Sequence, residues 1–152
     1  VLHSESAATS LAGMFEAVPL RLLRDIVSTS GAVVVLSSAW RQSEAGIDEV
    51  NGRLEQAGIA AVVSCTPTHG FATRSDEILH WLSLHPTVEA CVALDDMDLT
   101  EPHGAPLAAM FVHVDPARAL TQADADAAVA ALRRPLNRSA LPAAQTRDER
   151  LW

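Results

Sequence analysis

The sequence predicts an α/β fold, a Rossmann-like three-layer sandwich on a mainly parallel sheet. Two observations predict it. Apolar runs of strand length alternate with longer segments in which apolar residues recur at helical spacing. The runs are also nearly continuous, which is typical of strands covered on both faces. We expect one domain over residues 1–134, opening with a polar loop at 1–17, and a loosely packed tail at 135–152.

Two helices and two strands are expected in the first half of the chain. Pro19 suits the first turn of a helix, in which apolar residues recur until Gly31, a residue that commonly follows a helix end. The β-branched run AVVVL at 32–36 predicts the first strand. A second helix is expected from about 46 to 57, and the run IAAVV predicts a strand at 59–63.

The second half continues the alternation. Residues 74–84 have the apolar spacing of a helix, and a third strand is expected at 89–94. A Pro- and Gly-rich loop then leads to a fourth strand at 108–114. Thr121 is placed to cap a last helix over 122–133.

Composition excludes several classes of protein. Apolar residues make up 49% and charged residues 20%, which is globular. A net charge of -8 predicts no stable binding to nucleic acid and no attraction to anionic membranes. No stretch has the length of a membrane span, and no signal peptide is recognisable. The two cysteines are interpreted as small buried hydrophobes in a reducing compartment, so a cytoplasmic location is expected.

Polar residues follow the first expected strand. Ligands of parallel α/β sheets bind at the carboxyl ends of the strands, and 32–36 leads into Ser37-Ser38-Ala39-Trp40-Arg41. Two hydroxyls, free backbone N–H groups and an arginine can form an oxyanion cradle. The alternative is that these serines simply cap a helix.

Charged residues mark the same edge further along the chain. Asp95 and Asp96 follow the third expected strand, where paired carboxylates are typical of a Mg²⁺ site. The alternative is a solvated acidic turn. Arg74, at the start of a helix, can neutralise phosphate charge, or it can pair with Asp76 or Glu77 at the surface.

Other residues give weaker indications. The six histidines show no zinc-site spacing. Trp81 and Phe111 stand at positions that predict packing in the hydrophobic core. Trp40 is open to two interpretations: core packing, or stacking on a substrate base.

The order of these motifs resembles a known family. LSSAWR, then RSDEI around Arg74, then ALDDMDL stand in the order of motifs two to four of the haloacid dehalogenase (HAD) superfamily. The local sequence around these motifs resembles that of the HAD-like domain of bacterial Swiss Army Knife RNA-repair proteins over about residues 1–132.

The resemblance implies a HAD-like fold with a minimal cap and Mg²⁺-dependent phosphohydrolase chemistry through an aspartyl-phosphate. The substrate would be a phosphorylated small molecule or nucleic-acid end. Carried over by position, Ser37 and Arg74 would be catalytic and would contact the transferring phosphoryl group. Ser38 and Arg41 would be further substrate contacts. Asp95 and Asp96 would hold the metal.

One departure from the family pattern is large. The family's first motif, D-x-D-G, carries the nucleophile at the end of the central strand, and no D-x-D follows an apolar strand in this sequence. The expectation is a chain truncated just before Val1, without that central strand and inactive as given. The strands at 32–36 and 89–94 would then face a gap, or pair with each other.

Three functions are therefore weighed. The leading one is a HAD-like phosphohydrolase domain. The main alternative is a non-catalytic HAD-like module that binds a phosphorylated ligand or a partner. A more distant alternative is another doubly wound binding domain, in which the paired aspartates are a surface turn.

Overall fold

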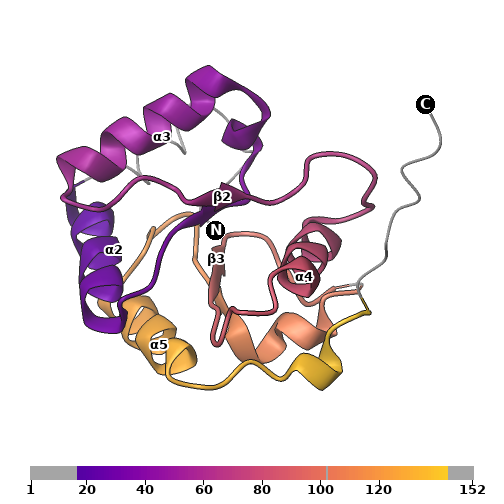
Figure 1. Cartoon of the computed structure of the whole chain (residues 1–152). Helices are drawn as coiled ribbons and strands as arrows, with labels where there is room; N and C mark the ends of the chain where they lie inside the picture. The colour runs from indigo at the N-terminus through magenta and orange to yellow at the C-terminus, as the bar shows by residue number, and fades with distance from the viewer. Residues whose placement is uncertain (1–16, 102, 144–152) are drawn as a thin grey trace.

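The computed structural model describes residues 17–101 and 103–143 of the chain, and within them it is an α/β fold (Figure 1). Nearly all of the predicted loop at 1–17 and the last part of the predicted tail lie outside these residues. The regular elements, in chain order, are α2 (Ala17–Ser30), β1 (Val35–Leu36), η1 (Ala39–Gln42), α3 (Glu44–Gln56), β2 (Ser64–Cys65), α4 (Arg74–Leu84), β3 (Ala93–Asp95), η2 (Ala105–Met110), β4 (Phe111–His113), α5 (Gln122–Leu132) and η3 (Arg138–Ala140).

The described strands form two separate two-stranded sheets, and both are parallel. In one sheet Val35 of β1 is paired with Ser64 of β2, and in the other Ala93 of β3 is paired with Phe111 of β4. β1 and β3 do not pair with each other. The sequence left open whether these two strands pair with each other or are separated by a gap. In the described residues they are separated.

An apolar cavity of about 260 Å³ lies between the two sheets. Val34 and Val35 line it from the β1 side, and Ala90, Val92 and Leu94 line it from the β3 side. Each sheet therefore turns one strand edge and an apolar surface toward the other sheet, without a backbone hydrogen-bond ladder between them.

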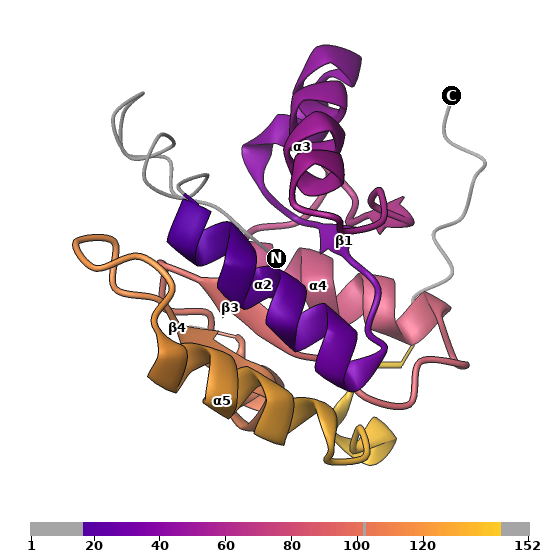
Figure 2. The same cartoon turned by 90° about the vertical axis from the view of Figure 1, so that its left-hand side faces the viewer.

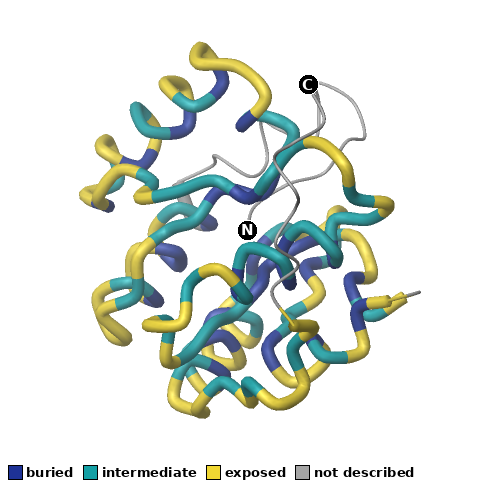
Figure 3. Tube along the Cα trace, turned by 45° about the vertical axis from the view of Figure 1, so that its right-hand side comes forward, coloured by how far each residue is buried: buried dark blue, intermediate teal, exposed yellow. Residues whose placement is uncertain are grey.

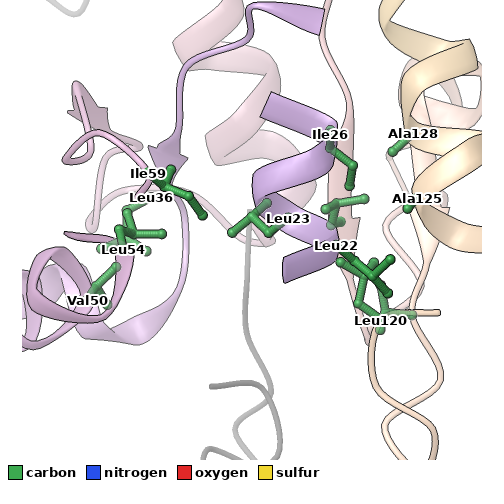
Figure 4. Close-up of a cluster of buried hydrophobic side chains, with 12 residues drawn as sticks. Leu22, Leu23, Ile26, Leu36, Val50, Leu54, Ile59, Leu120, Ala125 and Ala128 are labelled. Carbon is green, nitrogen blue, oxygen red and sulfur yellow. The ribbon is translucent and has the colours of Figure 1, made fainter. Parts of the chain in front are cut away.

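Helices cover the strands on both sides. Figures 1 and 2 show α2 and α5 lying side by side on one side of the strands, with α4 on the other. The buried core between α2, α3 and α5 includes Leu22, Leu23, Ile26, Val50, Leu54, Leu120, Ala125 and Ala128. In Figure 4 the side chains of α2 lie between those of α3 and those at the start of α5. No helix among the described residues is long and apolar enough to cross a membrane.

A second buried cluster packs on the opposite side. Its fully or nearly buried members are Ile78, Leu79, Leu82, Ala93, Leu99, Leu107 and Met110. Figure 3 shows how buried and exposed residues are distributed along the described chain. The neighbours Ala93 and Leu94 pack in different clusters, because consecutive residues of a strand point to opposite faces. Trp81 and Phe111 pack against the second cluster, as their spacing predicts.

The described part of the predicted tail contacts α4. Leu136 and Leu141 pack on the second cluster. The Arg138 guanidinium donates to the carbonyls of Leu82, His85 and Val88, so it caps the end of α4. The division of the chain at residue 134 stays a prediction.

The helices begin and end close to where the sequence places them. α4 has the predicted bounds, and both α4 and α5 open with a capping box, in which Thr73 and Thr121 accept from the third residue of their helices. Gly31 and Gly58 follow α2 and α3 with φ of +70° and +73°, a backbone conformation that glycine adopts without strain.

The strands differ more from their predicted bounds. The pairing that was expected at 59–63 lies at Ser64–Cys65, and the ladder extends back only through the bond from Val63 N to Val34 O. Residues 108–110 are not part of a strand but lie in η2, whose first turn contains Pro106, a residue that this position tolerates. Apolar runs show where a chain is buried, but hydrogen-bonding partners set the bounds of a strand.

Candidate functional site

The two serines after β1 are fully buried and differ in their contacts. Ser37 Oγ accepts from Thr66 Oγ1 at 2.9 Å, which joins the ends of β1 and β2. Ser38 Oγ has no hydrogen-bond partner among the described residues. Neither serine caps a helix: Ser38 precedes η1 without a side-chain cap, and Ser43 caps α3. The capping alternative is therefore not what the structure shows.

Arg41 lies in η1 with only 3% of its side chain exposed. Nε donates to Thr66 O at 3.0 Å, and Nη1 donates to Ser37 O and, at 2.8 Å, to Ser38 O. Nη2 donates to Pro67 O at 3.0 Å and to Glu77 Oε2 at 2.6 Å. All five guanidinium N–H donors are therefore used. The predicted contact between Arg41 and a phosphate would require one of these bonds to break.

Arg74 and Asp95 form a buried ion pair at the end of β3. Arg74 Nη1 lies 2.9 Å from Asp95 Oδ2, and the side chains are 11% and 0% exposed. Asp95 Oδ1 accepts from the Met97 N–H at 3.0 Å, so both carboxylate oxygens are bonded. The alternative in which Arg74 pairs with Asp76 or Glu77 at the surface does not hold, since Asp76 bonds Thr73 and Glu77 bonds Arg41.

Asp96 follows directly and is half-buried. The His113 ring nitrogen Nε2 lies 2.9 Å from the Asp96 carbonyl oxygen, which links this turn to the end of β4. Asp98 bonds the Thr100 hydroxyl and N–H, and these bonds hold the pKa of its carboxyl below the usual range. The turn after β3 thus carries three carboxylates within four residues.

The first turn of α4 joins the two strand ends. Arg74 reaches Asp95 at the end of β3, and Glu77, one turn along, reaches Arg41 after β1. Residues three apart share one face of a helix. Through this turn, the segment after β1 that carries the serines is connected to the acids at the end of β3.

Sequence reasoning missed Thr66 and the role of Glu77. Burial raises the pKa of Glu77 above its ordinary value, although Arg41 and Arg74 both act to lower it. A signal was present, because Glu77 stands at helical spacing from Arg74 on a face that also carries Ile78. Nothing in the sequence pairs Glu77 with Arg41, which is 36 residues away.

A polar cavity of about 330 Å³ adjoins these residues. Its walls include Arg41, Arg74 and Glu77, together with Phe71 and the half-exposed Met97.

The predicted metal ligands have the right chemistry for Mg²⁺. This ion takes one or two carboxylates and completes its shell with water and substrate phosphate, and Asp95 and Asp96 are adjacent carboxylates at one strand end. An ion bound to Asp95 would compete with Arg74 or the Met97 N–H for an oxygen. Within the described residues no three His, Cys, Asp or Glu side chains come together in a metal-binding group, so a larger all-protein cage is not seen there.

Comparison with known proteins gives one match. The family model described as the HAD domain in Swiss Army Knife RNA repair proteins matches residues 1–125 of the 152. No curated protein matches the chain, and no solved structure matches it. The family match covers the whole described site, from Ser37 to His113.

Proposed function

The chain belongs to the family of HAD domains found in Swiss Army Knife RNA repair proteins, and on that premise we propose that it binds a phosphoryl group at the ends of β1 and β3 as a Mg²⁺-dependent phosphohydrolase domain. The substrate would be a phosphorylated small molecule or a phosphorylated nucleic-acid end. HAD-like hydrolase identity follows from the family, whereas the metal, the substrate and the residue roles are the proposal.

The buried Ser38 hydroxyl is the observation that carries the proposal. A buried hydroxyl without a hydrogen bond costs about 1–3 kcal/mol, and Ser38 Oγ has no partner among the described residues. A phosphoryl oxygen would supply that partner. Ser37 would donate to the same group once its hydroxyl hydrogen turns toward the ligand, because its oxygen already accepts from Thr66.

Arg74 supplies the positive charge. Its guanidinium has five N–H donors, and among the described residues one of them is bonded, to Asp95. The remaining donors would meet a phosphoryl oxygen. Asp95 and Asp96 would hold Mg²⁺, which would neutralise charge on the phosphoryl group when bound. Arg74 would then be shared between its carboxylate and the substrate.

The family chemistry needs an aspartate nucleophile, and we assign none of the described residues to that role. Because no D-x-D follows an apolar strand in the sequence, we expect this chain alone to bind phosphate without rapid turnover. The second candidate is a non-catalytic phosphate-binding module, because a buried hydroxyl such as that of Ser38 and a guanidinium such as that of Arg74 bind an anion without a nucleophile.

Two measurements test the proposal. Titration of inorganic phosphate with and without Mg²⁺, followed by amide NMR shifts, should perturb Ser37, Ser38 and Arg74. Release of phosphate from p-nitrophenyl phosphate and from a 5′- or 3′-phosphorylated oligonucleotide then separates enzyme from binding module. Asp96→Asn should abolish the Mg²⁺ effect, while His80→Ala should not. Absence of phosphate binding at these residues would refute both candidates.

A further inference from the structure

Arg41 connects the two segments that follow β1 and β2. Its guanidinium donates to four backbone carbonyls, those of Ser37, Ser38, Thr66 and Pro67. These carbonyls belong to the same segments that carry the Ser37 and Thr66 hydroxyls. The position of the cation therefore sets the position of both segments.

The carbonyls are neutral, so they do not compensate the charge of a buried guanidinium. Glu77 is the carboxylate that does, at 2.6 Å and with only 14% of its side chain exposed. Removing one partner of an ion pair this well buried strongly destabilises the fold, because the other charge stays buried without compensation. Among the hydrogen-bond partners of the Arg41 guanidinium in the described part of the chain, Glu77 is also the one that lies outside these two segments.

Glu77 is fixed in turn by α4. The helix begins at a complete capping box formed by Thr73 and Asp76, and its first residue, Arg74, is held by Asp95. Glu77 and Arg74 therefore stand on one short, well-anchored turn. The distance between the Ser37–Ser38 segment and the Arg74 guanidinium is set through this turn.

We propose that Glu77 is a positioning residue, which acts through Arg41 to hold Ser37 and Ser38 at the right place relative to Arg74. The inference rests on the proposed function, because it assumes that these groups bind one phosphoryl group. It assigns Arg41 to the support of the site and not to direct contact with the substrate. No reacting atom needs to touch Glu77.

Charge and position predict opposite effects on phosphate affinity, which makes the inference testable. Removing the negative charge of Glu77 should tighten binding of an anion if charge alone matters. If position matters, Glu77→Ala should weaken binding, and Glu77→Gln should largely restore it because its amide oxygen still accepts from Arg41.

The experiment uses the full chain with inorganic phosphate as the probe. Amide hydrogen exchange is measured over residues 37–42 and 64–67, with α5 as an internal reference. In Glu77→Ala we expect exchange in these two segments to rise at least ~10-fold and phosphate affinity to fall ~10-fold, since a charge-assisted hydrogen bond is lost. Glu77→Gln should stay within about threefold of wild type in both.

Glu49→Gln is the matched control. Glu49 also bonds an arginine, Arg53, at 2.8 Å, but both side chains are nearly half exposed and lie in α3. It should change neither readout. Tighter phosphate binding in Glu77→Ala, or unchanged protection of both segments, would overturn the inference. If Glu77→Ala does not fold, weaker phosphate binding by Glu77→Gln with wild-type protection would overturn it.

Failure of the proposed function looks different. If the wild-type chain binds no phosphate, the phosphohydrolase and phosphate-binding proposals both fail. The exchange measurement still decides whether Glu77 holds the two segments, because it needs no ligand.

Discussion

The segments that follow β1 and β3 lie at one edge of the molecule but are held by different forces. After β1, hydroxyls and backbone carbonyls surround a guanidinium whose donors are all used. At the end of β3, the buried carboxylate of Asp95 is held by Arg74 and one N–H, and two further acids follow. The segment after β1 is held by its own hydrogen bonds without a ligand. At the end of β3, Asp95 can exchange Arg74 for another cation.

This contrast shows how a rigid segment and a responsive one can be joined through a single helix turn. Contacts with backbone carbonyls change little when a small ion binds nearby. A carboxylate paired with an arginine responds to any cation or anion that competes for either partner. We therefore expect changes after β1 to alter stability most, and changes after β3 to alter ligand binding most.

The largest expected effect comes from removing Arg41. Arg41→Ala leaves Glu77 as a buried charge without its cation and removes the guanidinium bonds to four carbonyls, so the free energy of unfolding should fall by about 3–5 kcal/mol. Urea denaturation measures it. Arg53→Ala removes an ion pair whose side chains are nearly half exposed, and it should lower the free energy of unfolding by less than about 0.5 kcal/mol. Equal losses in the two variants would contradict the contrast.

Asp95→Asn tests the other segment. It removes a fully buried carboxylate from Arg74 while nearly keeping its shape, and we expect a loss of about 2 kcal/mol in the free energy of unfolding. In EDTA, inorganic phosphate should bind several-fold tighter, because Arg74 is released and a negative charge is gone. Mg²⁺ should no longer alter that affinity. Isothermal titration with and without Mg²⁺ measures both effects, and weaker phosphate binding in EDTA would argue against the exchange of partners.

The two serines should respond with opposite signs. Ser38→Ala removes a buried hydroxyl without a partner and should stabilise the fold by about 1 kcal/mol while weakening phosphate binding. Ser37→Ala breaks the bond from Thr66 and should destabilise it by about 1 kcal/mol. Thermal denaturation of both variants side by side checks the signs. A destabilised Ser38→Ala would mean that its hydroxyl is already satisfied.

The smallest expected effect is the dependence of stability on low pH through Asp76. Burial acts to raise the pKa of Asp76, but hydrogen bonds from Thr73 and the nearby His103 bring it below its usual value of 3.8. A carboxyl with a lowered pKa in the folded state contributes stability above pH 3.8, and this contribution is lost as the pH falls through the lowered pKa. Asp76→Asn should therefore flatten the stability curve below about pH 4 and cost under about 1 kcal/mol at pH 7. Urea midpoints across this range measure it.

Much of the fold could be predicted from local signals. Helix bounds follow from caps such as Thr73 and Thr121 and from glycines such as Gly31, since each acts within a few residues. Strand bounds do not, because the pairing of Val35 with Ser64 depends on how two distant segments meet. Apolar composition places 59–63 in the interior without fixing its register.

The site could be predicted in outline and not in its contacts. Motif order places Ser37, Arg74 and Asp95 at one edge, and Arg74 does meet Asp95. Arg41 has the same residue type as a phosphate contact, yet its donors point to carbonyls, a fact that only three-dimensional packing reveals. The roles of Ser37, Ser38, Arg41, Arg74, Asp95 and Asp96 toward a ligand stay predictions.

The separation of the two sheets has a consequence for how the chain folds. Val35 pairs with Ser64 and Ala93 with Phe111, so each pairing closes a loop of at most about 30 residues at modest entropic cost. The halves are then joined by side chains, chiefly where α2 meets α5 and where Arg41 meets Glu77. Without a shared backbone ladder, each half is a candidate cooperative unit of its own. A calorimetric enthalpy of unfolding larger than the van't Hoff enthalpy would reveal that the two halves melt separately.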